Sequence, residues 1–314
     1  VLAGAQENII NFKGKAAFNC WITQQKKQSV QQNQPCVDRK TLIQSIKDNS
    51  LLLDRYVELR NYKRFVGNTY NNHKHDYIQI ERLIKLKDLF LAELALLISR
   101  GKSEEALREW LKDTQYWQMV IRDKQSFVFK AVATLIYGKN LKFLPVILSS
   151  SPTLSQQYKS ELIKTLDTPA FGKLGWDIAA TMRAEYEVMK VFEKEADQNI
   201  NFFYRVNATR NLLYSYAKDM VWLSQQKIED FEKAKKKIDQ KYPNDNIWQK
   251  LFYNAVGNFI LGISDTVPYT IRSYHVTYSH ARMLILYIDA KSQNIPPSDM
   301  AEFINKSEKK FWNP

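Results

Sequence analysis

The stretch DYIQIERLIKLKDLFLAELALLISRGKSEEALREWLKDTQYWQMVIRD, residues Asp76–Asp123, contains two periodic apolar segments separated by a short turn. In each segment the apolar residues recur mostly at three- and four-residue steps, which places them on one face of a helix. They are Ile80, Leu83, Ile84, Phe90, Leu94, Leu97 and Ile98 in the first segment, and Ala106, Leu107, Trp110, Leu111, Trp117, Val120 and Ile121 in the second. The pattern predicts a helical hairpin that needs further helices to cover it.

The turn of this hairpin has residues suited to ending one helix and starting the next. Gly101 follows Arg100, and glycine readily adopts the left-handed conformation found just after many helix ends. Ser103 is expected to cap the second helix, and Glu104 and Glu105 would lie near its positive N-terminal end. We therefore expect the two arms to be antiparallel neighbours.

The whole chain of 314 residues is predicted to be all-α, because it has few glycines and prolines and no convincing alternating strand pattern. Its 45% hydrophobic content is enough for a substantial core. We expect an array of antiparallel helical hairpins, either TPR-like or an irregular α-superhelix. The other helices are predicted at Asp38–Asp48, Ser50–Tyr62, Phe127–Tyr137, Leu141–Leu148, Ser155–Leu166, Trp176–Ala196, Ala208–Lys241 with a break near Gln226, Ile247–Ile263, Tyr269–Ala290 and Ser298–Lys310.

The strongest helix breakers suggest how the chain is divided. Ser149-Ser150-Ser151-Pro152 and Asp167-Thr168-Pro169 predict a boundary or a change in packing direction. We expect an N-terminal segment over 1–37, helical hairpins over 38–150 and a C-terminal helical region over 151–314, the last two either separate or one continuous domain.

The turn Ser99-Arg100-Gly101-Lys102-Ser103-Glu104-Glu105-Ala106-Leu107 resembles the inter-helix turn of a tetratricopeptide repeat, with Ala106 as the small residue between the arms. The resemblance covers one hairpin, and no second copy follows at a 34-residue period. A wider arrangement resembles uncharacterised membrane-anchored, periplasmic all-helical proteins of bacteria: a cysteine-bounded loop, then Leu51-Leu52-Leu53-Asp54-Arg55-Tyr56, and later Asn254-Ala255-Val256-Gly257-Asn258. This resemblance implies a periplasmic domain behind one N-terminal anchor.

Cys20 and Cys36, the two cysteines of the chain, flank a polar segment that has no apparent core of its own. In an oxidising compartment a disulfide across this span would restrict the unfolded chain by about 3 kcal/mol. The alternative is a pair of reduced thiols in a cytosolic protein. We predict the disulfide, because no metal-ligand spacing accompanies the pair.

The net charge of +13 favours anionic surroundings such as nucleic acid, lipid head groups or acidic glycans. No nucleic-acid-binding motif is present, so nonspecific nucleic-acid binding is a minor alternative. The apolar runs Leu89–Leu97 and Met283–Ile288 are shorter than the ~20 residues that span a bilayer. Because the sequence begins at Val1 without an initiator methionine, we expect a leader or membrane anchor to have been removed.

The two pairs of histidines are the first candidates for chemistry. His73 and Tyr77 resemble the base and proton donor of helical-toroid polysaccharide lyases, and the alternative is a polar turn in which Asp76 caps the following helix. His275 and His280 are five residues apart, which rotates them away from each other on a helix and disfavours a shared metal. No cofactor or metal site is predicted.

Glu93 and the aromatic residues complete the candidates. Glu93 lies within an apolar run, so it must face solvent, pair with a cation or have a raised pKa. The aromatic residues are predicted to be mostly core, with some lining a concave surface. They are Trp110, Tyr116, Trp117, Phe202, Phe203, Tyr204, Tyr214, Tyr216, Trp222, Trp248, Phe252 and Tyr253, together with Tyr274 and Tyr278, which share a face.

These observations favour a non-enzymatic scaffold or binding module in the bacterial cell envelope, with a protein or peptide partner. The alternatives are a lyase acting on acidic polysaccharide and a nonspecific nucleic-acid-binding protein.

Overall fold

The computed structural model describes residues 39–64, 73–122, 127–151, 153–167, 178–183, 206–242, 266–296 and 298–311. Every regular element in these ranges is a helix, so the all-α prediction is confirmed. The helices are α2 (Arg39–Asp48), α3 (Ser50–Leu59), α4 (His73–Ser99), α5 (Ser103–Arg122), α6 (Phe127–Ser150), α7 (Leu154–Gln157), α8 (Lys159–Leu166), α10 (Val206–Ser224), α11 (Ile228–Lys241), α14 (Thr266–Ser292) and α15 (Met300–Phe311). The finer prediction of TPR-like repeats stays a prediction.

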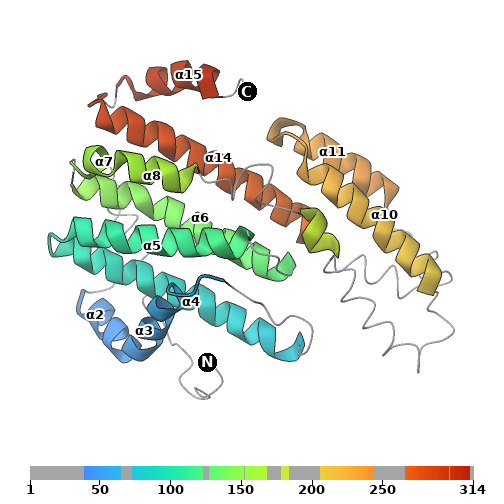
Figure 1. The fold of residues 1–314 in the computed structure, drawn as a ribbon, viewed down its shortest axis with the longest axis horizontal. Helices are drawn as coiled ribbons and strands as arrows, with labels where there is room; N and C mark the ends of the chain where they lie inside the picture. The colour runs from blue at the N-terminus through green and yellow to red at the C-terminus, as the bar shows by residue number, and fades with distance from the viewer. Residues whose placement is uncertain are drawn as a thin grey trace, which may run out of the picture.

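Four long helices, α4, α5, α6 and α14, lie side by side in a row (Figure 1). Helices α2 and α3 pack on α4 at one end of the row, and α7, α8 and α15 pack on α14 near the other. The α10–α11 pair also contacts α14. A continuous group of buried apolar side chains runs from Leu42 in α2 to Ile288 in α14, so α14 carries the core across the predicted boundary near residue 151.

The predicted hairpin is formed by α4 and α5. Gly101 has φ +77°, and its N–H donates to the Ile98 carbonyl over 2.9 Å. The Lys102 N–H donates to the Leu97 carbonyl over 3.0 Å, which completes the glycine-based end of α4. The predicted cap at Ser103 is wrong by one residue, because the Lys102 carbonyl accepts the first helical N–H, that of Ala106. The Ser103 hydroxyl instead accepts a hydrogen bond from Ser150 at the end of α6.

Helix α6 contradicts the prediction of two short helices divided at Gly138. It runs unbroken through both Gly138 and Pro145. Proline lacks the N–H that would bond four residues back, yet Leu141, Phe143 and Leu144 around it are fully buried. Their burial outweighs the local preference of Pro145 to break the helix, which is about 3 kcal/mol.

Other boundaries also differ in detail. The helix predicted at Ser155–Leu166 is interrupted at Tyr158, whose hydroxyl is held by Glu104 and Arg108 of α5. Helix α14 begins at Thr266, so Pro268 lies in its first turn rather than between helices, where a missing N–H costs little. The predicted break near Gln226 is confirmed by the turn between α10 and α11.

The sequence also predicted no apolar run long enough to span a bilayer. One described helix, α6, reaches that length and hydropathy over Phe129–Ser150. The sequence analysis did not recognise this stretch, because short polar interruptions divide its apolar residues. In this structure 67% of its apolar window is buried, and α4, α5 and α14 pack around it. The core helix of a globular protein passes the same test, so this stretch is weak evidence for a membrane span.

Candidate functional site

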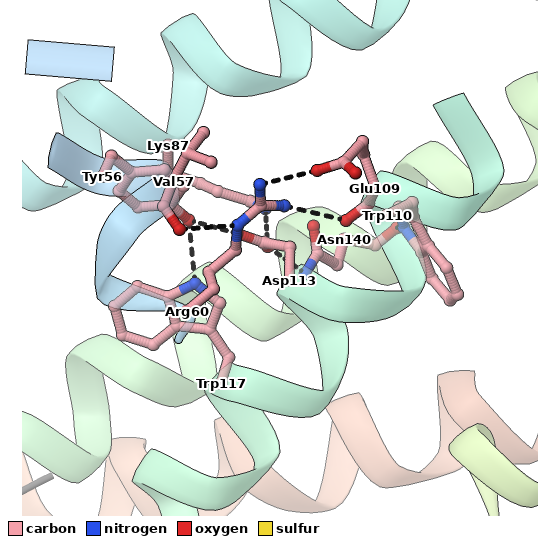
Figure 2. Close-up of polar contacts among 9 residues, drawn as sticks. All are labelled: Tyr56, Val57, Arg60, Lys87, Glu109, Trp110, Asp113, Trp117 and Asn140. Atoms are coloured by element: carbon pink, nitrogen blue, oxygen red, sulfur yellow. Dashed lines mark hydrogen bonds and ion pairs between the residues drawn. The ribbon is translucent and has the colours of Figure 1, made fainter. Parts of the chain in front are cut away.

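Asp113 is the centre of a buried polar cluster, which we call the Asp113 cluster (Tyr56, Arg60, Lys87, Glu109, Trp110, Asp113, Trp117 and Asn140; Figure 2). Its carboxylate is fully buried on α5. Oδ1 accepts a 2.7 Å bond from the Tyr56 hydroxyl, and Oδ2 accepts bonds from Lys87 Nζ and, over 2.7 Å, from Asn140 Nδ2. One carboxylate therefore joins α3, α4, α5 and α6.

Lys87 is an ammonium group with 0% exposure. Burial lowers its pKa to about 8, although the nearby Asp113 carboxylate opposes this shift. Its Nζ also lies 4.7 Å from the centre of the Phe90 ring, which adds a cation–π contact. The charged form of Lys87 is thus held by Asp113 and by one aromatic face.

Tyr56 completes the inner part of the cluster. Its hydroxyl donates to Asp113 and accepts a 2.9 Å bond from Trp117 Nε1. Burial raises the pKa of Tyr56 well above its usual value, and the Asp113 charge raises it further. Tyr56 therefore stays a neutral donor, which suits a role in orienting the carboxylate.

Arg60 and Glu109 form the outer edge of the cluster. Arg60 donates to the Glu109 carboxylate over 2.6 Å and to the Glu109 carbonyl over 3.1 Å, and its guanidinium lies 4.9 Å from the Phe90 ring centre. Burial works to raise the pKa of Glu109, but hydrogen bonds from Lys112 and Arg60 hold it below its usual value. Arg60 therefore contacts the same aromatic ring as Lys87.

Trp110 ties the cluster to the middle of α6. Its Nε1 donates to the Asn140 carbonyl over 2.9 Å. The Asn140 amide must direct Nδ2 toward Asp113, since two facing oxygens would repel. Its Oδ1 is consequently buried without a hydrogen-bond partner in this structure.

A lysine, a tyrosine and a carboxylate in contact are residue types that can transfer protons. Here Lys87 Nζ donates to Asp113 Oδ2, so the two charged groups are already paired with each other, and both side chains are fully buried. Removing one partner of such a pair costs about 3–5 kcal/mol, because the other charge is left buried and unpaired. The geometry therefore supports a structural role: the Asp113 cluster sets how four helices pack.

The predicted catalytic pair, His73 and Tyr77, lies at the start of α4. Their side chains are outside the described part of the structure. Helix α4 begins at His73, so Asp76 is within the first turn rather than before it, and the predicted cap at Asp76 is wrong. Cys20 and Cys36, with the rest of residues 1–37, also lie outside the described residues, and the disulfide stays a prediction.

Glu93 is half-buried on α4, and burial raises its pKa while Arg60 opposes the shift. Of its three expected outcomes, the surroundings of Glu93 favour a raised pKa. The sequence analysis missed Lys87 and Asp113. One sequence pattern could have found them: a charged residue at a position where the apolar period predicts a core residue. Lys87 occupies such a position between Leu83 and Phe90.

The second histidine pair is separated as expected. His275 faces the Phe231 ring of α11, with ring centres 6.0 Å apart, and burial lowers its pKa. Tyr274 is buried, and Tyr278 packs at the edge of the core. Among the described residues no group of three His, Cys, Asp or Glu side chains is placed to hold a metal ion.

The predicted aromatic residues that lie in the described part of the structure divide into two groups, and the others lie outside it: Phe202, Phe203, Tyr204, Trp248, Phe252 and Tyr253. Trp110, Tyr116, Trp117 and Tyr216 are buried, whereas Tyr214 and Trp222 on α10 are exposed. Comparisons with protein-family models, with curated proteins and with solved structures found no match to this chain.

Proposed function

We propose that this chain is a non-enzymatic scaffold or binding module of the bacterial cell envelope, and that it binds a protein partner through the outer side of α10 and α14. The observation that carries the proposal is the distribution of exposed apolar side chains. Of the eight large hydrophobic residues exposed in the described ranges, five lie on these two helices: Tyr214, Trp222, Tyr269, Val276 and Met283. Exposed apolar residues gathered on one part of a surface favour an interaction site.

The opposite side of α14 is held firmly by the rest of the fold. Apolar residues such as Ile271 and Ala281 are fully buried. Ion pairs join α14 to α8 and to the residue that follows it: Lys159 to Asp289 at 2.5 Å, and Arg282 to Asp167 at 2.6 Å. A helix anchored in this way presents its exposed residues in one arrangement, which lowers the entropic cost of binding.

The envelope location rests on sequence features: the two-cysteine loop and the resemblance to membrane-anchored periplasmic proteins. A periplasmic protein would carry the Cys20–Cys36 disulfide, whereas a cytosolic one would keep both thiols reduced. Mass spectrometry of unreduced protein taken from the host's envelope checks this part. Two alkylatable thiols would contradict both the disulfide and the location.

Binding is tested by placing the photo-reactive residue p-benzoylphenylalanine at Val276 in the host cell. We expect illumination to give a discrete cross-linked product, with the partner peptide identified by mass spectrometry. The matched control is the same residue at Leu51, which is 63% exposed on α3 at the other end of the row. No product at Val276, or the same products at both positions, would overturn the proposal.

A second proposed function is a lyase acting on acidic polysaccharide. It is favoured by one observation: α4 starts at His73, so His73 and Tyr77 lie one helical turn apart at the same helix end. Incubation with alginate or hyaluronan should then produce the ultraviolet absorbance of unsaturated uronates, and His73→Ala should remove it. A flat trace across such polymers would reject this function.

A further inference from the structure

His275 of α14 lies at the place where the end of α10 and the start of α11 pack on that helix. Its ring centre is 6.0 Å from that of Phe231 on α11 and 5.9 Å from that of the neighbouring Tyr274, and both contacts are edge-on. The ring also hydrogen-bonds the backbone of Ser224, the last residue of α10. One side chain of α14 therefore contacts both helices of the α10–α11 pair.

The Nε2 atom of His275 is buried and has no hydrogen-bond partner in this structure. The bond to Ser224 therefore uses Nδ1, and the neutral ring carries its proton there. A second proton, on Nε2, would place a positive charge and an N–H without an acceptor in this contact. Burial accordingly lowers the pKa of His275, while the hydrogen bond with the Ser224 backbone opposes the shift. The contact favours the neutral imidazole.

The charged side chains of the described helices around His275 pair with one another. Glu232 of α11 lies 3.2 Å from Arg272 of α14, and Lys235 of α11 lies 2.6 Å from Asp239. The other charged residues within one turn of Ser224 or Phe231 are exposed: Lys227, Glu229, Asp230 and Lys233. None of these carboxylates or ammonium groups belongs to a class that ordinarily titrates between pH 5.5 and 7.5.

The groups on α10 and α6 complete the surroundings. Asp219 of α10 accepts a 2.7 Å bond from Lys241, and Lys139 of α6, behind α14, lies 2.5 Å from Asp88. Burial raises the pKa of two nearby phenols above its usual value, and a third lies on the next turn of α14: Tyr137 and Tyr274, and then Tyr278. Histidine is the side chain that ordinarily changes charge between pH 5.5 and 7.5, so His275 is the group at this contact that responds in that range.

We infer that His275 is a pH-sensitive latch, which holds the α10–α11 pair against α14 when it is neutral and releases the pair when it is protonated. Among the described helices the pair packs mainly on α14, beside the row formed by α4, α5, α6 and α14 (Figure 1). Loosening this one contact therefore frees both helices together, and it uncovers buried apolar residues such as Met220, Leu223 and Phe231. The inference goes beyond the proposed function, and its test needs no partner.

The direction of the pH effect follows from the two forms of the contact. In the released form the imidazole takes up a proton near its ordinary pKa of about 6.5. In the packed form it does so only at lower pH. Between these two values, each unit of falling pH increases the equilibrium constant for release by up to about tenfold. Above about pH 7.5 both forms are neutral, and pH has no effect through His275.

The test is hydrogen–deuterium exchange of the full 314-residue chain at pH 7.5 and pH 5.5, corrected for the intrinsic exchange rate. We expect the protection of amides in α10 and α11 to fall by about five- to tenfold at the lower pH. Protection in α5 and α6, which carry much of the buried core, should stay the same. These two helices are the internal reference for general acid destabilisation.

Substitutions then assign the response. His275→Gln keeps an amide that can bond the Ser224 backbone but cannot become charged, so the difference between the two pH values should disappear. The matched control is His280→Gln, at the other histidine of α14, which is also half-buried and should keep the response. Each variant is compared with itself at two pH values, so one that loosens the pair at every pH still gives an answer.

A second measurement uses the unchanged chain, in case His275→Gln does not fold. Nitrogen-15 NMR of its four histidine rings should show one that titrates below the ordinary range and carries its proton on Nδ1 when neutral. Four results would overturn the inference: no change in α10–α11 protection between the two pH values, an equal loss in α5 and α6, a loss that persists in His275→Gln, or the absence of such a ring.

Discussion

Two parts of the molecule join a tyrosine, a lysine and an aspartate in the same way, and burial makes them behave differently. Around Asp113 the carboxylate accepts bonds from Tyr56 and Lys87. At the α10–α11 end Asp219 accepts a 2.6 Å bond from Tyr242 and a 2.7 Å bond from Lys241. Lys87 is fully buried, whereas the Lys241 side chain is 53% exposed.

The pKa values of the two lysines shift in opposite directions. Burial lowers the pKa of Lys87 to about 8, despite its carboxylate. The hydrogen bond to Asp219 raises the pKa of Lys241, with a smaller contribution from Tyr242, because solvent still reaches that ammonium group. The same three residue types therefore form a costly but position-defining core contact in one place and a surface contact in the other.

The largest expected effect comes from breaking the buried triad. Asp113→Asn keeps the shape of the side chain but leaves the Lys87 charge buried without its counter-ion. We expect the free energy of unfolding to fall by about 3–5 kcal/mol, measured by urea denaturation. The matched change Asp219→Asn should shift the urea midpoint far less, because its partners stay hydrated. Equal losses in the two variants would contradict the difference between the triads.

A second substitution sharpens the comparison by removing the stranded charge. Adding Lys87→Met to Asp113→Asn should recover about 1–3 kcal/mol, because the unpaired Lys87 charge is then gone and Tyr56 and Asn140 keep a polar neighbour. The same urea series measures this recovery as a double-mutant cycle. In the surface triad, adding Lys241→Met to Asp219→Asn should recover nothing measurable. Additive losses at the buried site would show that Lys87 and Asp113 are not coupled.

The smallest expected effect is on pH dependence. Between pH 8 and 9.5 the unfolded chain keeps the Lys87 position protonated, while the folded chain releases that proton. Stability attributable to Lys87 therefore rises with pH, with a slope of at most about 1.4 kcal/mol per pH unit. Lys87→Met should remove this rise. Lys241→Met should keep it, since a raised pKa loses its stabilisation only above the ordinary lysine range. A rise that persists in Lys87→Met would exclude Lys87 as its source.

The sequence predictions were accurate where residues close together in the chain decide where a helix ends. The α4–α5 turn was found because glycine readily takes a positive φ after Arg100, and the break near Gln226 was also predicted at the right place. Errors arose where distant residues intervene. Tyr158 interrupts the helix predicted at Ser155–Leu166 while its hydroxyl bonds to α5, and Pro145 stays helical because its surroundings are buried.

The sequence by itself determined that this chain is helical, where most helices lie and that its surface is basic, because propensity, apolar period and charge are properties of neighbouring residues. Only the tertiary structure decided that Lys87 and Asp113 meet, since they are contributed by different helices and acquire their energetics from shared burial. It also decided which apolar residues of α14 stay outside. Tyr269 and Ile271 are both apolar and two residues apart, and only the packing of the neighbouring helices around α14 leaves one exposed and buries the other.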